Sequence, residues 1–138
     1  MTPQRFQYAK SQTFPGLAGM PFLPLALTNR TCAVSVRALV DSGATVNVLP
    51  YDIGLQLGLI WDVQRVPAPL WGTLDDVQAW GVRVMGQIEP FPALPLVFAW
   101  TQKTSQEVPV ILGQTNFFQA FKVAFDGKAG TFEIVLNR

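Results

Sequence analysis

The sequence contains no histidine and only one cysteine, Cys32. The absence of histidine excludes catalysis by a Ser-His-Asp triad or a Cys-His pair, and it excludes histidine-ligated metal sites. A single cysteine cannot form an intrachain disulfide, and its place in an alternating apolar run predicts a small core residue in a strand. A hydrolase built from these residue types would therefore have to use carboxylates.

Charged residues are also scarce. They make up 14% of the 138 residues, against 49% hydrophobic residues, and the net charge is +1. The basic side chains before the first acid, Asp41, are scattered and form no stripe, so we expect no binding to nucleic acid. The chain is long enough to bury a core as one domain. Its apolar excess favours a buried subunit interface, although a well-filled β core would have the same composition.

Long apolar runs are missing as well. The two most apolar regions, 14–27 and 91–100, are interrupted by prolines, and neither reaches the roughly 18–20 residues that span a bilayer. The first ten residues are polar and lead into no continuous apolar segment, unlike a signal peptide. We therefore expect a soluble, cytoplasmic protein that does not bind membranes.

The stretch 38–50 has the most informative pattern. An apolar run leads to Asp41, the chain turns at Ser42 and Gly43, and a second apolar run begins at Val46. Asp, Ser and Gly are ordinary turn residues, but these flanks predict two buried strands that pull the turn inward. A buried carboxylate is costly unless it is hydrogen-bonded or shares a proton. We therefore predict that Asp41 has a chemical role.

The segment Leu-Val-Asp-Ser-Gly-Ala-Thr at 39–45 resembles the active-site loop of retropepsin-like aspartic proteases. A second element of that family's pattern, Val-Ile-Leu-Gly, follows at 110–113, before a short helical stretch at 114–121. The resemblance covers residues 23–136. It implies that a strand through Ile111 and Leu112 passes behind the aspartate loop, where Gly113 lets the two backbones approach closely.

The remaining pattern predicts an all-β fold. The first two strands form a hairpin around the polar turn 28–31, and the last two form a closing hairpin. Strands are predicted at 21–28, 31–40, 46–50, 82–88, 94–100, 108–112, 123–125 and 131–136. A short helix over 51–59 places Ile53 and Leu57 on one face, which Ile60 would continue, although Gly54 weakens the helix and Gly58 would end it.

These elements predict a single domain over residues 20–138. By the resemblance it is a retropepsin-like closed β-barrel with one or two short helices, a flap hairpin and a two-fold symmetric dimer. Residues 1–19 are expected to be an N-terminal arm that is flexible or lies at the dimer interface.

The segment 70–82 predicts a mobile hairpin, because two β-prone arms with a glycine in each flank a polar centre at Asp75-Asp76. The resemblance makes this hairpin the flap that closes over substrate, although a plain surface hairpin has the same pattern. Trp71 and Trp80 could enclose a substrate side chain, but a core or interface role fits either of them equally well. The adjacent acids lack further ligands, so we expect no metal ion or other cofactor. The expected substrate-binding residues of the flap are Trp71, Gly72, Thr73, Leu74 and Trp80.

Aspartic proteolysis needs two carboxylates that share a proton, one to take a proton from the attacking water and one to donate. The chain has one Asp-Ser-Gly, so the resemblance implies a homodimer in which Asp41 of each subunit meets at the two-fold axis. Ser42 would hydrogen-bond across the axis, and Gly43 would allow the close turn and offer its backbone to substrate. Ala44 and Thr45 would line the cleft. We predict an aspartic endopeptidase acting on a peptide or protein.

Two positions depart from the viral members of that family. Thr45 stands where many of them have an acid, and Gln114 follows Gly113 where they have arginine. Neutral groups thus replace the ion pair that commonly braces their dimer. This chain is longer than the viral enzymes, which fits a cellular or bacterial relative better than a viral one.

Two other hypotheses fit the same residues. The first is a catalytically silent module that keeps the fold, dimerises and holds an extended peptide by strand addition. The second is a structural β domain in which Asp41 is an ordinary turn residue.

Overall fold

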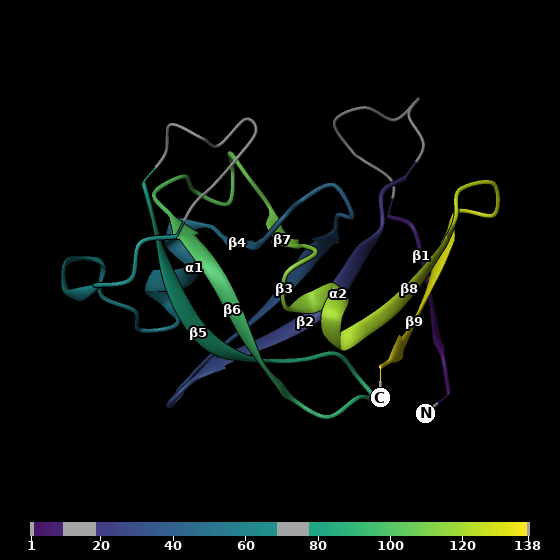
Figure 1. Ribbon diagram of the computed structural model, residues 1–138, viewed down its shortest axis with the longest axis horizontal. Helices are drawn as coiled ribbons and strands as arrows, with labels where there is room; N and C mark the ends of the chain where they lie inside the picture. The colour runs from purple at the N-terminus through teal and green to yellow at the C-terminus, as the bar shows by residue number, and fades with distance from the viewer. Residues whose placement is uncertain (1, 10–18, 69–77, 138) are drawn as a thin grey trace.

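The computed structural model describes residues 2–9, 19–68 and 78–137. Within them, the strands form a closed barrel in the order β2-β3-β7-β4-β6-β5 and a separate three-stranded sheet in the order β1-β9-β8 (Figure 1). The elements are β1 (Gln4–Gln7), β2 (Phe22–Asn29), β3 (Cys32–Val40), β4 (Asn47–Leu49), α1 (Tyr51–Gln56), the 3-10 turn η1 (Trp61–Val63), β5 (Ala79–Gln87), β6 (Leu94–Thr101), β7 (Val110–Leu112), α2 (Phe117–Ala120), β8 (Phe121–Asp126) and β9 (Thr131–Leu136). The predicted all-β barrel with two short helices is confirmed.

The hairpin of β2 and β3 leads into the Asp41 loop. In β2 the side chains of Leu23, Leu25 and Leu27 are buried and the residues between them are exposed, as in a strand with one solvated face. Arg30 turns the chain with a φ of 56°, in the left-handed region. The predicted hairpin around residues 28–31 is confirmed.

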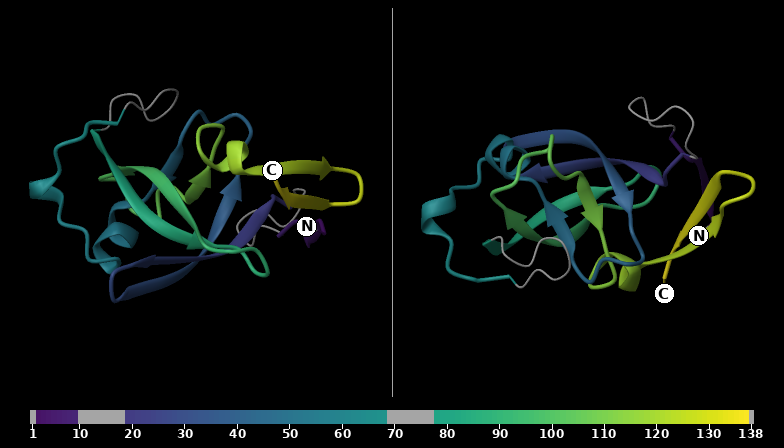
Figure 2. Two further views of the ribbon diagram at one scale, coloured as in Figure 1. Left: turned by 60° about the horizontal axis from the view of Figure 1, so that its bottom comes forward. Right: turned by 90° about the horizontal axis from the view of Figure 1, so that it is seen from above.

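Strand β7 lies between the two strands that flank the Asp41 loop. It pairs parallel with β3 and antiparallel with β4, and β4 pairs parallel with β6. The barrel closes through the antiparallel pairs of β5 with β2 and with β6. In both views of Figure 2 the hairpin of β8 and β9 extends to one side of this barrel. The loop is therefore held by a strand from the second half of the chain.

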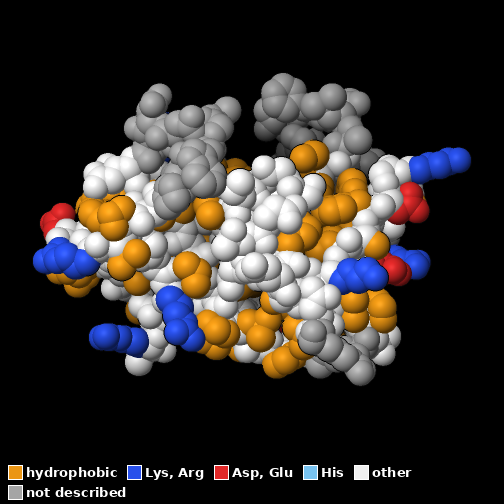
Figure 3. All heavy atoms as spheres, in the orientation of Figure 1, with side chains coloured by type: hydrophobic (Ala, Val, Ile, Leu, Met, Phe, Trp, Pro, Cys, Tyr) orange, Lys and Arg blue, Asp and Glu red, His pale blue; other side chains and the backbone are white. Residues whose placement is uncertain are grey.

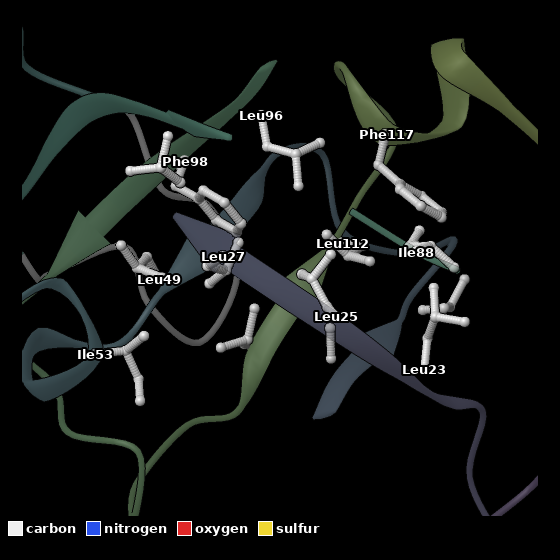
Figure 4. Close-up of a cluster of buried hydrophobic side chains, with 14 of the residues drawn as sticks. Leu23, Leu25, Leu27, Leu49, Ile53, Ile88, Leu96, Phe98, Leu112 and Phe117 are labelled. Carbon is white, nitrogen blue, oxygen red and sulfur yellow. The ribbon is translucent and has the colours of Figure 1, made fainter. Parts of the chain in front are cut away.

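Aliphatic and aromatic side chains from the strands and both helices fill the barrel (Figure 4). Phe98 of β6, Leu112 of β7 and Phe117 of α2 are almost completely buried. Burial of each such side chain contributes about 1.5–3 kcal/mol. This core fixes the strand ends from which the Asp41 loop and the β7–α2 turn emerge.

Helix α1 is shorter than the sequence predicts. Ile53 and Leu57 point into the core as expected, and Gly58 ends the helix with a φ of +79°. The prediction for Ile60 is wrong: its side chain is 60% exposed, because the helical period stops at Gly58. Gly54 faces the indole of Trp100, with which any Cβ would collide, so glycine is required for this contact.

Both ends of the described chain enter the three-stranded sheet. Strand β1 pairs antiparallel with β9, so residues 4–7 of the N-terminal arm belong to a sheet of their own chain. Phe6 stacks on Phe132 of β9 with ring centroids 5.5 Å apart, and Phe132 is buried. Figure 1 accordingly shows the two termini close together. Residues 10–18 of the arm lie outside the described residues.

The surface carries its charges at separate places. On the face shown in Figure 3 the Lys and Arg side chains lie scattered toward the two ends of the molecule and form no stripe. The ion pair of Arg5 with Glu133 joins exposed side chains at 2.8 Å and contributes little stability. In the part of the chain described, no helix is long and apolar enough to cross a membrane.

Candidate active site

Hydrogen bonds of Asp41 hold the loop after β3 in its conformation. The N–H of Asp41 donates to the C=O of Leu112 at 3.0 Å, and the C=O of Asp41 accepts from the N–H of Ala44 at 3.1 Å. The carboxylate oxygen Oδ1 accepts from the N–H of Gly43 at 2.9 Å. Asp41 is half-buried, whereas Ser42 and Gly43 are exposed, so the loop is more open than its apolar flanks predict. One side of the carboxylate is fixed and the loop surface remains accessible.

Gly113 lies where the end of β7 crosses the Asp41 loop. A Cβ at this position would lie 2.6 Å from the C=O oxygen of Val46 and 2.8 Å from that of Ala44. No real side chain tolerates such distances, so only glycine permits this approach. The close backbone contact implied by the family resemblance is present. Before Gly113, Leu112 is buried and Ile111 is half-buried.

The residues after Gly113 extend the contact with the loop. The N–H of Gln114 donates to the C=O of Ala44 at 2.9 Å, and the N–H of Thr115 donates to the C=O of Thr45 at 2.9 Å. The side-chain amide of Gln114 also donates to the C=O of Ser42 at 2.7 Å. At Thr45 and Gln114, where the sequence departs from the viral pattern, this chain therefore has uncharged hydrogen bonds within one chain and no ion pair.

Asn47 is a site residue that the sequence analysis missed. Its side chain is fully buried, and its Oδ1 accepts from the N–H of Gly113 at 2.8 Å. Its Nδ2 donates to the C=O of Val97 at 3.0 Å and to Oδ1 of Asn116 at 2.9 Å. Buried amides are costly unless they are bonded in this way. The available signal was a single amide inside the apolar run 46–50.

Asn116 completes this network. Its φ is +79°, and its Oδ1 accepts a second hydrogen bond from the N–H of Val97 at 3.1 Å. Its own N–H donates to Oε1 of Gln119 at 2.7 Å, which fixes the start of α2. The network therefore joins β4, β6 and the β7–α2 turn behind the Asp41 loop.

The flap prediction falls mostly on residues 69–77, so Trp71, Gly72, Thr73 and Leu74 lie outside the described residues. Trp80 is described, in β5, and its ring meets that of Trp61 edge to face at 6.2 Å. The indole N–H of Trp80 is buried and has no hydrogen-bond partner within residues 2–9, 19–68 and 78–137. These described contacts place Trp80 in an aromatic cluster with Trp61, Trp100 and Tyr51.

Asp52 of α1 has a structural role. Its two carboxylate oxygens accept from the N–H of Ser105 at 2.7 Å and from the Ser105 hydroxyl at 2.5 Å. Partial burial acts to raise the pKa of Asp52, but these hydrogen bonds outweigh it and hold the pKa below its ordinary value. Asp52 therefore fastens α1 to the loop after β6.

Metal-binding groups are absent from the described residues, among which no three Cys, Asp or Glu side chains are gathered at one place. The described part of the site offers one carboxylate, backbone N–H groups and neutral amides. Such a set can orient a water molecule or an extended peptide, and proton transfer at the site would fall to Asp41.

Comparison with known proteins identifies the fold. The search against family models gave no match, and neither did the search of curated proteins. Among solved structures, the chain is similar to the crystal structure of a retropepsin-like aspartic protease from Rickettsia conorii, with a TM-score of 0.68. The match covers 96% of this chain and 91% of that one, at 12% sequence identity. The chain thus has a retropepsin-like fold.

Proposed function

We propose that the chain is an aspartic endopeptidase that is active as a homodimer. The observation that carries this proposal is the geometry of the Asp41 loop, which β7 holds from behind through Leu112 and Gly113. The loop presents a half-buried carboxylate with one oxygen bonded to the N–H of Gly43. An ordinary surface turn requires neither the crossing strand nor the buried amide of Asn47 behind it.

The proposed reaction uses one carboxylate from each subunit. The ionised carboxylate takes a proton from a water molecule, whose oxygen attacks the carbonyl carbon of the scissile peptide. The protonated carboxyl donates its proton to the carbonyl oxygen, giving a tetrahedral diol. As the diol collapses, the C–N bond breaks and the carboxyl that took the water proton donates it to the leaving nitrogen. The other carboxylate takes a proton from a diol hydroxyl, which gives the product acid and restores the pair. Because one chain supplies one Asp-Ser-Gly, the second carboxylate comes from Asp41 of another copy.

The test is digestion of a diverse peptide library between about pH 3 and pH 7, with and without pepstatin. We expect cleavage by the wild type that is best below neutral pH, because one carboxyl of the pair must be protonated. The Asp41→Asn variant should lose about 10²–10⁴-fold in kcat, as when a general acid–base group is removed. The matched control is Asp62→Asn, on the exposed turn η1, which should retain wild-type activity.

Two outcomes would contradict the proposal. Full activity of the Asp41→Asn variant would remove Asp41 from the reaction. If the wild type cleaves no peptide at any pH and peptide binding survives Asp41→Ala, the chain would instead be a catalytically silent peptide-binding module. Sedimentation of the active protein provides a further check, because activity should rise with the dimer fraction and vanish in dilute monomer.

A further inference from the structure

The side chain of Gln114 is linked to the carboxylate of Asp41 by a single peptide unit. Its Nε2 donates to the C=O of Ser42 at 2.7 Å, although the two residues are 72 positions apart in the chain. The same peptide unit carries the N–H of Gly43, which donates to Oδ1 of Asp41 at 2.9 Å. A peptide unit is planar and turns as one body. A donor that fixes its carbonyl therefore also fixes the direction of its N–H.

The residue Gln114 is exposed, but its backbone is held in place. Its backbone N–H donates to the C=O of Ala44 at 2.9 Å, and the preceding Gly113 donates to the buried Asn47 at 2.8 Å. The Ser42–Gly43 peptide has less support of its own, because both residues are exposed and glycine imposes little restriction on φ. Without the amide of Gln114, rotation of this peptide would carry the Gly43 N–H away from Asp41.

We propose that Gln114 is a positioning residue that orients the Asp41 carboxylate through the Ser42–Gly43 peptide. The inference rests on the proposed function and adds a part to its machinery. The two hydrogen bonds lie in series, so each polarises the peptide in the sense that strengthens the other. The orientation of Oδ1 is thereby set within one chain before substrate binds.

A neutral donor suits this position. Asp41 is the only residue with an ionisable side chain in segments 38–50 and 108–121, which form the loop and the strand and helix behind it. The amide thus supplies a directed N–H without adding a charge next to a carboxylate that must gain and lose a proton. The expected consequence is that donor ability at position 114, and not charge there, governs kcat.

The decisive variant is Gln114→Glu, which has nearly the same shape and can donate only when its carboxyl is protonated. The measurement is the ratio of its kcat to that of the wild type from about pH 3.5 to pH 6. We expect a ratio near one at the acid end, falling to about one tenth as the introduced carboxyl ionises around pH 4–5. KM should change little, because the amide bonds to the loop and not to substrate.

Two further variants separate donor ability from other effects. Gln114→Met has no donor and no charge, so its kcat should be reduced by a similar factor at every pH. Gln102→Glu is the matched control, because Gln102 is exposed and its side chain makes no hydrogen bond within the described residues. Its kcat ratio to the wild type should stay near one throughout.

A kcat ratio for Gln114→Glu that does not change with pH, whether high or low, would overturn the inference. Hydrogen exchange of the Gly43 amide gives a readout that is independent of catalysis. Its protection should fall in Gln114→Glu relative to Gln102→Glu as the pH rises from about 3.5 to 6, and equal protection would also overturn the inference. If the wild type cleaves no peptide, the proposed function fails, and amide exchange still decides the role of Gln114.

Discussion

Replacement of Asn47 by alanine should be among the most destabilising changes near the site. The variant would leave the N–H of Gly113 and the C=O of Val97 without their partner, and Oδ1 of Asn116 would lose one of its two donors. Each buried polar group left unpaired costs about 1–3 kcal/mol. Because Asn116 keeps its bond to Val97, we expect a total loss of about 3 kcal/mol in the free energy of unfolding. For a chain of this length that corresponds to a melting temperature lower by about 10 °C.

Urea unfolding at neutral pH measures this loss, with Asn29→Ala as the matched control. Asn29 is half-buried, and its amide donates one hydrogen bond to the C=O of Leu57 at 2.9 Å. Its replacement should cost about 1 kcal/mol. If Asn47→Ala loses no more stability than Asn29→Ala, the hydrogen bonds of Asn47 do not contribute the free energy of unfolding that we assign to them.

The Asn47→Asp variant tests the same network by pH. Burial would raise the pKa of the introduced carboxyl, which can donate only when protonated. The folded state would then hold a proton that the unfolded chain releases above about pH 3.9, so stability should fall as the pH rises. A stability difference from the wild type that does not grow between about pH 4 and pH 7 would show that water reaches this amide.

Other substitutions test single contacts. Gly113→Ala should displace the loop, lower the activity and cost more than about 2 kcal/mol of stability. Gly127→Ala should cost far less in the same unfolding assay, because no atom of the described residues lies near a Cβ at that position. Gly54→Ala should collide with Trp100 and shift its fluorescence, and an unchanged spectrum would refute the contact. Asp52 has a lowered pKa, so its contribution should be present at pH 6 and decline as the pH falls through the folded-state pKa. The stability gap between wild type and Asp52→Asn should therefore narrow below about pH 4; a constant gap would contradict this.

The sequence was most informative for elements that depend on local patterns alone. The alternation in 22–40 and the turn at Arg30 predict the first hairpin, because strand period and turn chemistry are local properties. Gly113 was identified by the family resemblance, and its crowded surroundings supply the physical reason.

What could not be predicted depends on contacts between distant segments. Asn47 is a polar residue in an apolar run, and its three partners come from segments 50 to 69 positions away. Ile60 continues the apolar spacing of α1, but Gly58 turns the chain first and leaves Ile60 in solvent. Gly54 reads as a weak helix residue until the ring of Trp100 occupies the space beside it. Propensity and period do not contain this tertiary information.

The passage of β7 between β3 and β4 also bears on when the site can form. During synthesis, Asp41 leaves the ribosome long before Leu112 and Gly113, and until they arrive nothing holds the turn from behind. Closure of so long a loop is a slow event that comes with completion of the barrel. A partly made or truncated chain would thus carry the aspartate without its fixed geometry, and any proteolytic capacity would be confined to fully folded molecules.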